Sequence, residues 1–195
     1  MIAMNKPNDM RQHILDVARN LMTIKGYTAV GLAEVLSNAG VPKGSFYHYF
    51  RSKEDFGKAL LEEYFSEYIS RILPILAAQE SGAQCLRRYF EYWVETQGTD
   101  VPQQKCLVVK LGPEVCDLSE DMRDVLEKGT ARIVSALASC ISRGVEDGSI
   151  TSAIEPNALA EALYQLWLGA SLQAKLQKST KAFETASQAV NCLIH

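Results

Sequence analysis

Residues 43–49 bring an amine, a hydroxyl, an imidazole and two phenols into one short run. These side chains are Lys43, Ser45, Tyr47, His48 and Tyr49. Groups of this kind donate hydrogen bonds to phosphate oxygens and to base edges in the major groove of DNA. Phe46 and Phe50 are four residues apart, so one apolar edge can hold a short helix on a core. The chemistry that this run suits is therefore nucleic-acid binding.

Two helices and a tight turn must position this run. Apolar residues upstream have helical spacing and predict a helix over 31–38. They are Leu32, Val35, Leu36 and Ala39. Gly40 supplies a turn, and Pro42 can begin the next helix because the first helical position needs no N–H donor. This is the helix-turn-helix pattern, although on spacing alone a surface helical hairpin of any all-α protein explains it as well.

The full run from Gly40 to Phe50, with Ser52-Lys53-Glu54 after it, resembles the DNA-binding signature of TetR-family transcriptional regulators. The resemblance implies that the DNA contacts are Lys43, Gly44, Ser45, Tyr47, His48, Tyr49 and Lys53. We expect phosphate contacts from Ser45, Tyr47 and Lys53, and a guanine contact from Lys43. The family commonly has Thr or Ser where this chain has Val30 and Gly31, so a backbone N–H would have to replace that hydroxyl at a phosphate.

Cysteines are the second group that could do chemistry, and they stand at positions 85, 106, 116, 140 and 192. Their odd number, without Cys-x-x-Cys or histidine spacing, argues against a disulfide scaffold and a zinc site. Cys106 is expected near the start of a short helix, with cations at Lys105 and Lys110. A helix N-terminus and cations favour the reactive thiolate. By contrast, acidic neighbours should disfavour the thiolate of Cys116, and Cys140 falls on an apolar stripe expected in the core.

The stretches 105–111, 114–123 and 163–175 look like the NemR type of TetR-family repressor, which responds to electrophiles and oxidants through cysteine. The resemblance implies a repressor that leaves a palindromic operator when Cys106 is modified. Three alternatives stay open: a regulator with a non-covalent effector and idle cysteines, a thiol-dependent enzyme, and a helical interaction protein that has lost DNA binding. The three histidines, at 13, 48 and 195, argue against a Cys-His catalytic pair and against an enzyme.

One face of the predicted helix 156–177 carries Tyr164, Trp167, Ser171 and Lys175 at helical spacing. With Trp93, the first three are expected to line an effector pocket, and Lys175 is expected near the modified cysteine. Core packing of the aromatic rings, with Lys175 reaching solvent, is the alternative. Small residues nearby would let another helix approach, and the resemblance implies a homodimer through the last two helices.

Composition is consistent with a globular regulator. Of 195 residues, 47% are apolar and 22% charged, which indicates a packed core and not disorder. The net charge is −3, but residues 1–56 carry seven Lys and Arg against five Asp and Glu, so the N-terminal part is mildly basic. No apolar run could span a bilayer or serve as a signal peptide, so we expect a cytoplasmic protein. We also expect no cofactor.

The predicted fold is all-α, with about nine helices. We place a three-helix DNA-binding domain at 1–52 and a larger helical domain for ligand sensing and dimerisation at 53–195. The expected helices are 9–25, 31–38, a short one from Pro42, 52–77, 83–97, 104–111, 119–146, 156–177 and 180–193. The sixth is expected to stop at Gly112-Pro113.

Overall fold

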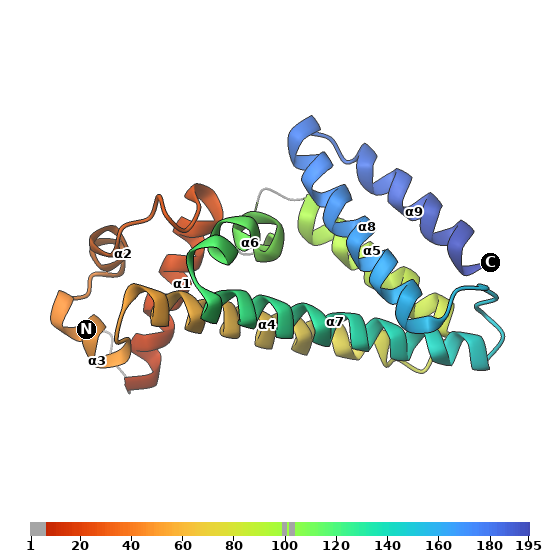
Figure 1. Cartoon of the computed structure of the whole chain (residues 1–195), viewed down its shortest axis with the longest axis horizontal. Coiled ribbons are helices and arrows are strands. Elements are labelled where there is room, and N and C mark those ends of the chain that lie inside the picture. The colour runs from red at the N-terminus through yellow and green to blue at the C-terminus, as the bar shows by residue number, and fades with distance from the viewer. Residues whose placement is uncertain (1–6, 99–100, 102–103) are drawn as a thin grey trace, which may run out of the picture. The chain divides into compact units, whose positions relative to one another are not determined.

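The computed structural model describes residues 7–98, 101 and 104–195, and within these residues it contains nine helices and no strand (Figure 1). The helices are α1 (Pro7–Lys25), α2 (Leu32–Ala39), α3 (Lys43–Tyr49), α4 (Lys53–Leu76), α5 (Gly82–Gly98), α6 (Leu107–Leu118), α7 (Glu120–Glu146), α8 (Pro156–Gln177) and α9 (Lys181–Ile194). The predicted all-α fold is confirmed. None of the described helices is long and apolar enough to cross a membrane.

The end of α6 corrects the sequence prediction. Helix α6 begins after Cys106 and continues through Pro113 to Leu118, so Gly112-Pro113 does not stop it. A proline inside a helix removes one backbone hydrogen bond. Burial of Leu111 and Val115, on either side of Pro113, holds the helix together despite that loss.

The chain divides into two compact units. The first combines Met1–Tyr64 with Lys105–Leu126, and the second combines Phe65–Gln104 with Glu127–His195. The long helices α4 and α7 therefore each contribute to both units. Helix α6 belongs to the same unit as α1, α2 and α3. The predicted boundary between residues 52 and 53 concerns function and stays a prediction.

Aromatic packing positions α3 within the first unit. The rings of Phe46, Phe50 and Phe56 are buried, with centroids 4.9–5.4 Å apart. Gly40 ends α2 in the left-handed conformation, with φ of 65°, and its N–H is directed at the carbonyls of the last turn. The predicted apolar edge of Phe46 and Phe50 is confirmed, and it leaves the opposite side of α3 exposed.

Stacked aromatic rings fill the second unit between α5, α8 and α9. Trp167 is fully buried and stacks on Phe90 and Phe183, with centroid distances of 4.6 and 5.8 Å. The backbones of α5 and α7 meet at two glycines, since a Cβ added to Gly82 would lie 2.3 Å from the Cα of Gly144. A side chain at Gly82 would therefore clash with the backbone of α7.

Candidate nucleic-acid interface and cysteine site

Helix α3 presents the polar run that the sequence singled out. Lys43, Gly44, Tyr47 and His48 are exposed, and Ser45 and Tyr49 are half-buried. These six residues therefore occupy one short helix, in which Phe46 is the buried residue. Such a face can meet phosphates and base edges in a groove of DNA.

The seventh predicted DNA contact, Lys53, begins α4 and is half-buried. Its ammonium nitrogen donates to the carbonyl of Tyr27 at 3.3 Å and lies 4.8 Å from the centre of that ring. Lys53 therefore holds the turn between α1 and α2. Its role at a phosphate stays a prediction.

The start of α2 lacks a side-chain cap, as the sequence indicated. Gly31 occupies the N-cap in extended conformation and forms no side-chain hydrogen bond. Contacts to α1 fix α2 instead: Lys25 forms an ion pair with Glu34, and Nε2 of His13 lies 3.0 Å from the carbonyl oxygen of Ala39. The backbone at the start of α2 is therefore held without a hydroxyl cap.

Cys106 lies at the N-cap of α6, as predicted, but its thiolate is not favoured as we expected. Its side chain is 7% exposed, and this burial raises the pKa of the thiol. The backbone N–H of Val109 and the hydroxyl of Tyr64 act in the opposite direction without reversing the shift. Lys110 was expected to favour the Cys106 thiolate. Its ammonium instead donates a hydrogen bond to the carbonyl of Ile24 at 3.0 Å.

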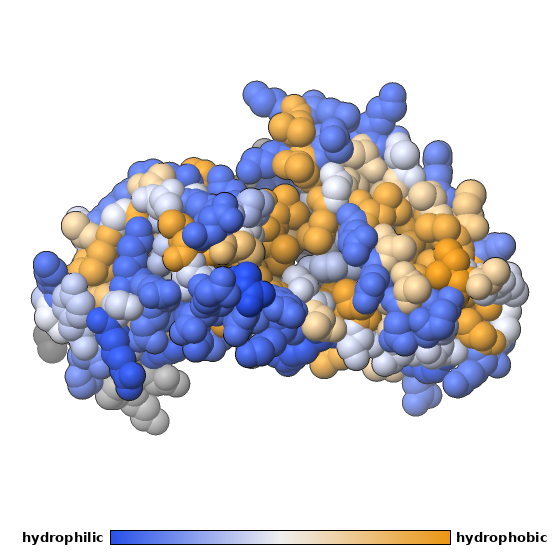
Figure 2. Space-filling model, in the orientation of Figure 1, coloured by the Kyte–Doolittle hydropathy of each residue, from blue (hydrophilic) through white to orange (hydrophobic). Residues whose placement is uncertain are grey.

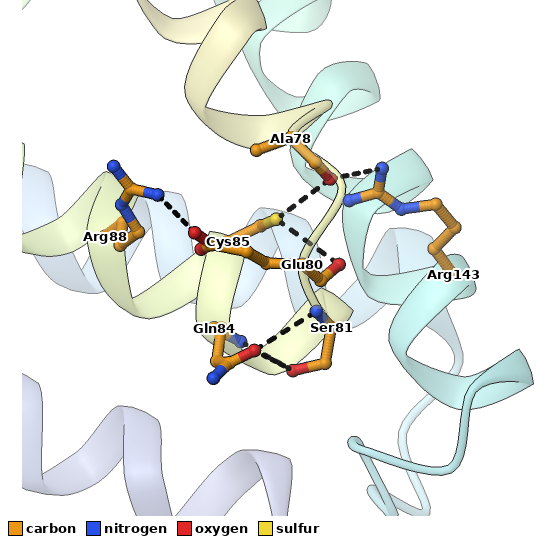
Figure 3. Close-up of polar contacts among 7 residues, drawn as sticks. All are labelled: Ala78, Glu80, Ser81, Gln84, Cys85, Arg88 and Arg143. Carbon is orange, nitrogen blue, oxygen red and sulfur yellow. Dashed lines mark hydrogen bonds and ion pairs between the residues drawn. The ribbon is translucent and has the colours of Figure 1, made fainter.

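The other thiols differ in access. Cys140 is buried, as predicted, and burial raises its pKa to about 11. Cys85 is also buried, and Figure 3 shows its sulfur near the carbonyl oxygens of Ala78 and Glu80, at 3.5 and 3.8 Å. Cys116 is half-buried and Cys192 is exposed. Exposure alone therefore makes Cys192 the easiest thiol to reach.

The residues predicted to line a pocket come together in the second unit. Nε1 of Trp93 donates to the hydroxyl of Ser171 at 2.9 Å, and that hydroxyl donates to the carbonyl of Trp167 at 2.9 Å. Tyr164 packs edge-on to Trp93 and also borders a groove between α7 and α8. The three rings and Ser171 are buried, which is also what the core alternative describes. Their role as pocket lining stays a prediction.

Lys175 lies in the last turn of α8 and is exposed. It belongs to the second unit, whereas Cys106 belongs to the first. The predicted pairing of Lys175 with a modified cysteine stays a prediction. Among the described residues, no three His, Cys, Asp or Glu side chains gather as metal ligands.

Sequence reasoning missed a contact between Tyr27, in the turn after α1, and Glu114 of α6. Tyr27 was not singled out, and Glu114 entered only as a neighbour of Cys116. The carboxylate of Glu114 accepts the N–H of Tyr27 at 3.0 Å, although the two residues are 87 positions apart. No local pattern in the sequence signals a contact of that range.

Comparison with known proteins assigns both parts of the chain. The family of bacterial regulatory proteins called tetR matches residues 14–60, and the tetracyclin repressor-like C-terminal domain matches residues 82–190. The chain is 41% identical to the HTH-type transcriptional repressor NemR of Escherichia coli strain K12, across 98% of each chain. It is 32% identical to the HTH-type transcriptional repressor DhaR of Mycobacterium sp. strain GP1, across 90% of this chain and 87% of DhaR.

A solved structure agrees with these matches. The reduced form of Escherichia coli NemR superposes with a TM-score of 0.91 at 40% sequence identity, covering 96% of this chain and 97% of that one. The matches extend over the exposed face of α3 and over the helices of the second unit. They identify a DNA-binding transcriptional regulator and not an enzyme. The chain belongs to the TetR family of bacterial regulatory proteins.

Proposed function

We propose that this protein is a repressor that binds a palindromic operator as a homodimer and leaves it when a small molecule acts on it. The exposed polar face of α3 carries the proposal, because the buried edge of Phe46 and Phe50 fixes which side of the helix faces outward. Relatives named NemR and DhaR are repressors, which supports repression as the direction of regulation.

Selection of bound DNA from a random pool tests this proposal. Two recognition helices of a dimer should enrich a palindrome whose half-sites are one helical turn, or a multiple of it, apart. Replacement of Lys43 and Tyr47 by alanine should abolish the enrichment while α3 stays anchored through Phe46. A wild-type protein that enriches no sequence would overturn the proposal.

The homodimer is proposed to form through α8 and α9. These helices lie side by side (Figure 1) and enclose a groove lined by Gly169, Ala170, Leu172, Ala182 and Ala186, among others. Figure 2 shows apolar surface over this part of the second unit, and Leu172 and Leu176 of α8 are exposed. Small residues and exposed leucines suit close packing against a second copy of the same face.

The finer part of the proposal is that an electrophile or oxidant modifies Cys106. With an α,β-unsaturated carbonyl, the sulfur would bond to the β-carbon, and the thiol proton would end on the α-carbon. The N–H of Val109 and the hydroxyl of Tyr64 support this role, because they stabilise the sulfur anion once the thiol ionises. The similarity to NemR, which covers 98% of this chain, supports it as well.

A non-covalent effector on the same fold is the second candidate, and the burial of Cys106 favours it. A buried thiol with a raised pKa ionises rarely at neutral pH, and the thiolate is the nucleophile. Cys106→Ser separates the two candidates. Loss of the response to the effector supports covalent sensing, whereas an unchanged response assigns the effector to a non-covalent site.

A further inference from the structure

Helix α6 binds the end of α1 and the turn after it through two charged side chains. Lys110 donates to the carbonyl of Ile24 at 3.0 Å. Four residues later, Glu114 accepts the N–H groups of Tyr27 and Thr28 at 3.0 and 2.6 Å, and the Thr28 hydroxyl donates to the same carboxylate. All these residues belong to the first compact unit.

The charges match what a helix end offers. Ile24 carries one of the last carbonyls of α1, which have no partner within the helix, so a lysine there is favourable. The chain then reverses at Gly26, with φ of 101°, and presents two successive N–H groups to one carboxylate. Although burial acts to raise it, hydrogen bonds from Thr28 and Tyr27 lower the pKa of Glu114. The carboxylate is therefore held as an anion by the turn.

The same turn is fixed to α4 on its other side. The hydroxyl of Tyr27 donates to the carbonyl of Lys53 at 2.8 Å. Gly57 permits this approach, since a Cβ there would lie 2.8 Å from the Tyr27 ring and 2.6 Å from the sulfur of Met122. Tyr27 thus contacts α4 through its ring and α6 through its backbone, five residues before α2 begins.

We propose that Glu114 is a positioning residue for operator binding. By fixing the N–H groups of Tyr27 and Thr28, it sets the turn from which α2 starts, and α2 in turn sets α3 across Gly40. The inference rests on the proposed function, because it needs an operator. It differs from the predicted contacts in that Glu114 acts through the backbone and carries the same sign of charge as DNA.

The negative charge of Glu114 allows its positioning role to be distinguished from a simple effect of charge on DNA binding. Loss of an acidic side chain should by itself strengthen binding to a polyanion. Asp117 is an exposed carboxylate on the same helix, three residues away, and is the matched control. We expect Glu114→Ala to weaken operator binding about tenfold, because hydrogen bonds to a charged acceptor are among the strong ones. Asp117→Ala should leave the Kd unchanged or lower it.

A conservative variant and amide hydrogen exchange separate positioning from general stability. Glu114→Gln keeps an acceptor oxygen and should recover part of the lost affinity, while Glu114→Ala should speed exchange at the amides of residues 27 and 28. If Glu114→Ala fails to fold, Glu114→Gln is compared with Asp117→Asn. We then expect a smaller loss of operator affinity for Glu114→Gln and none for Asp117→Asn. Equal Kd values for the Glu114 and Asp117 variants overturn the inference alone. A folded wild-type protein without a specific operator overturns the proposed function, and the inference with it.

Discussion

Tyr27 and Lys53 form two reciprocal hydrogen bonds, in which each side chain donates to the backbone carbonyl of the other residue. The Tyr27 hydroxyl donates to the Lys53 carbonyl at 2.8 Å, and the Lys53 ammonium donates to the Tyr27 carbonyl at 3.3 Å. The same ammonium lies over the tyrosine ring, and burial, with Glu54 and Glu114 nearby, raises the pKa of Tyr27 to about 12. Two hydrogen bonds and a cation–ring contact therefore join the start of α4 to the turn after α1.

This relationship sharpens the prediction for Lys53. Lys53→Ala should weaken DNA binding about equally on all sequences and reduce the salt slope of log K by about one unit, as the loss of one phosphate contact does. Tyr27→Phe is the control, since it removes only the hydroxyl bond to the Lys53 backbone. If both variants lose affinity with an unchanged salt slope, Lys53 acts by holding the turn and not by contacting a phosphate.

Lys43 should behave differently from Lys53, because it stands exposed on α3. Lys43→Ala should relax the preference at one operator position by about 1–3 kcal/mol, the usual size of a specific base contact. Binding to single-substitution operators measures this effect. Equal losses on every operator would assign Lys43 to a phosphate.

The face of α3 could be predicted from sequence because its pattern is local. Residues 43–50 carry both the apolar edge and the polar side, and the glycine turn stands next to them. The contacts of Tyr27 and Glu114 could not be predicted, since they join segments 86 and 87 positions apart. For the same reason the hydrogen bond of Trp93 to Ser171, 78 positions away, appears only in the structure.

The pKa of the Cys106 thiol could not be predicted from local sequence either. Its place at a helix start follows from local spacing, and the structure confirms it. The sign of its pKa shift depends on how much solvent the fold excludes, and that is decided by residues remote in sequence such as Tyr64. Neighbouring lysines in the sequence were therefore a poor guide to the ionisation of this thiol.

Dimer formation should depend on Leu172, which is 47% exposed on α8 and lines the groove between α8 and α9. Leu172→Glu would place a charge in the proposed interface without disturbing the core of its own chain, so we expect folded monomers that bind the operator poorly. Leu73→Glu, at an exposed leucine of α4, is the matched control. Sedimentation at several concentrations gives the answer, and a dimeric Leu172→Glu protein with full affinity would remove α8 from the interface.

Acid should abolish the contribution of Glu114 to stability. Because its folded pKa is lowered from the ordinary value of 4.5, its stabilisation is present above that value and is lost as the pH falls through the folded pKa. The difference in unfolding free energy between wild type and Glu114→Ala should therefore be constant from pH 7 to pH 5 and shrink below pH 4. Denaturant titrations over this range measure it, with Asp117→Ala as reference. A difference that persists undiminished into acid would mean that the carboxylate charge is not what the turn recognises.

The switch should reside in Cys106 despite its burial. With N-ethylmaleimide we expect Cys192, which is exposed in the single chain, to react first, and Cys106 to react more slowly, at a rate that rises with pH because its pKa is raised. Operator release should follow the second modification, which mass mapping of the same samples can resolve. An added group that favours the non-binding state by about 1.4 kcal/mol shifts the equilibrium tenfold. Cys192→Ser should respond as wild type does, and Cys106→Ser should bind the operator and ignore the reagent. Release that follows modification of Cys192, or a Cys106→Ser protein that still responds, would move the sensing role away from Cys106.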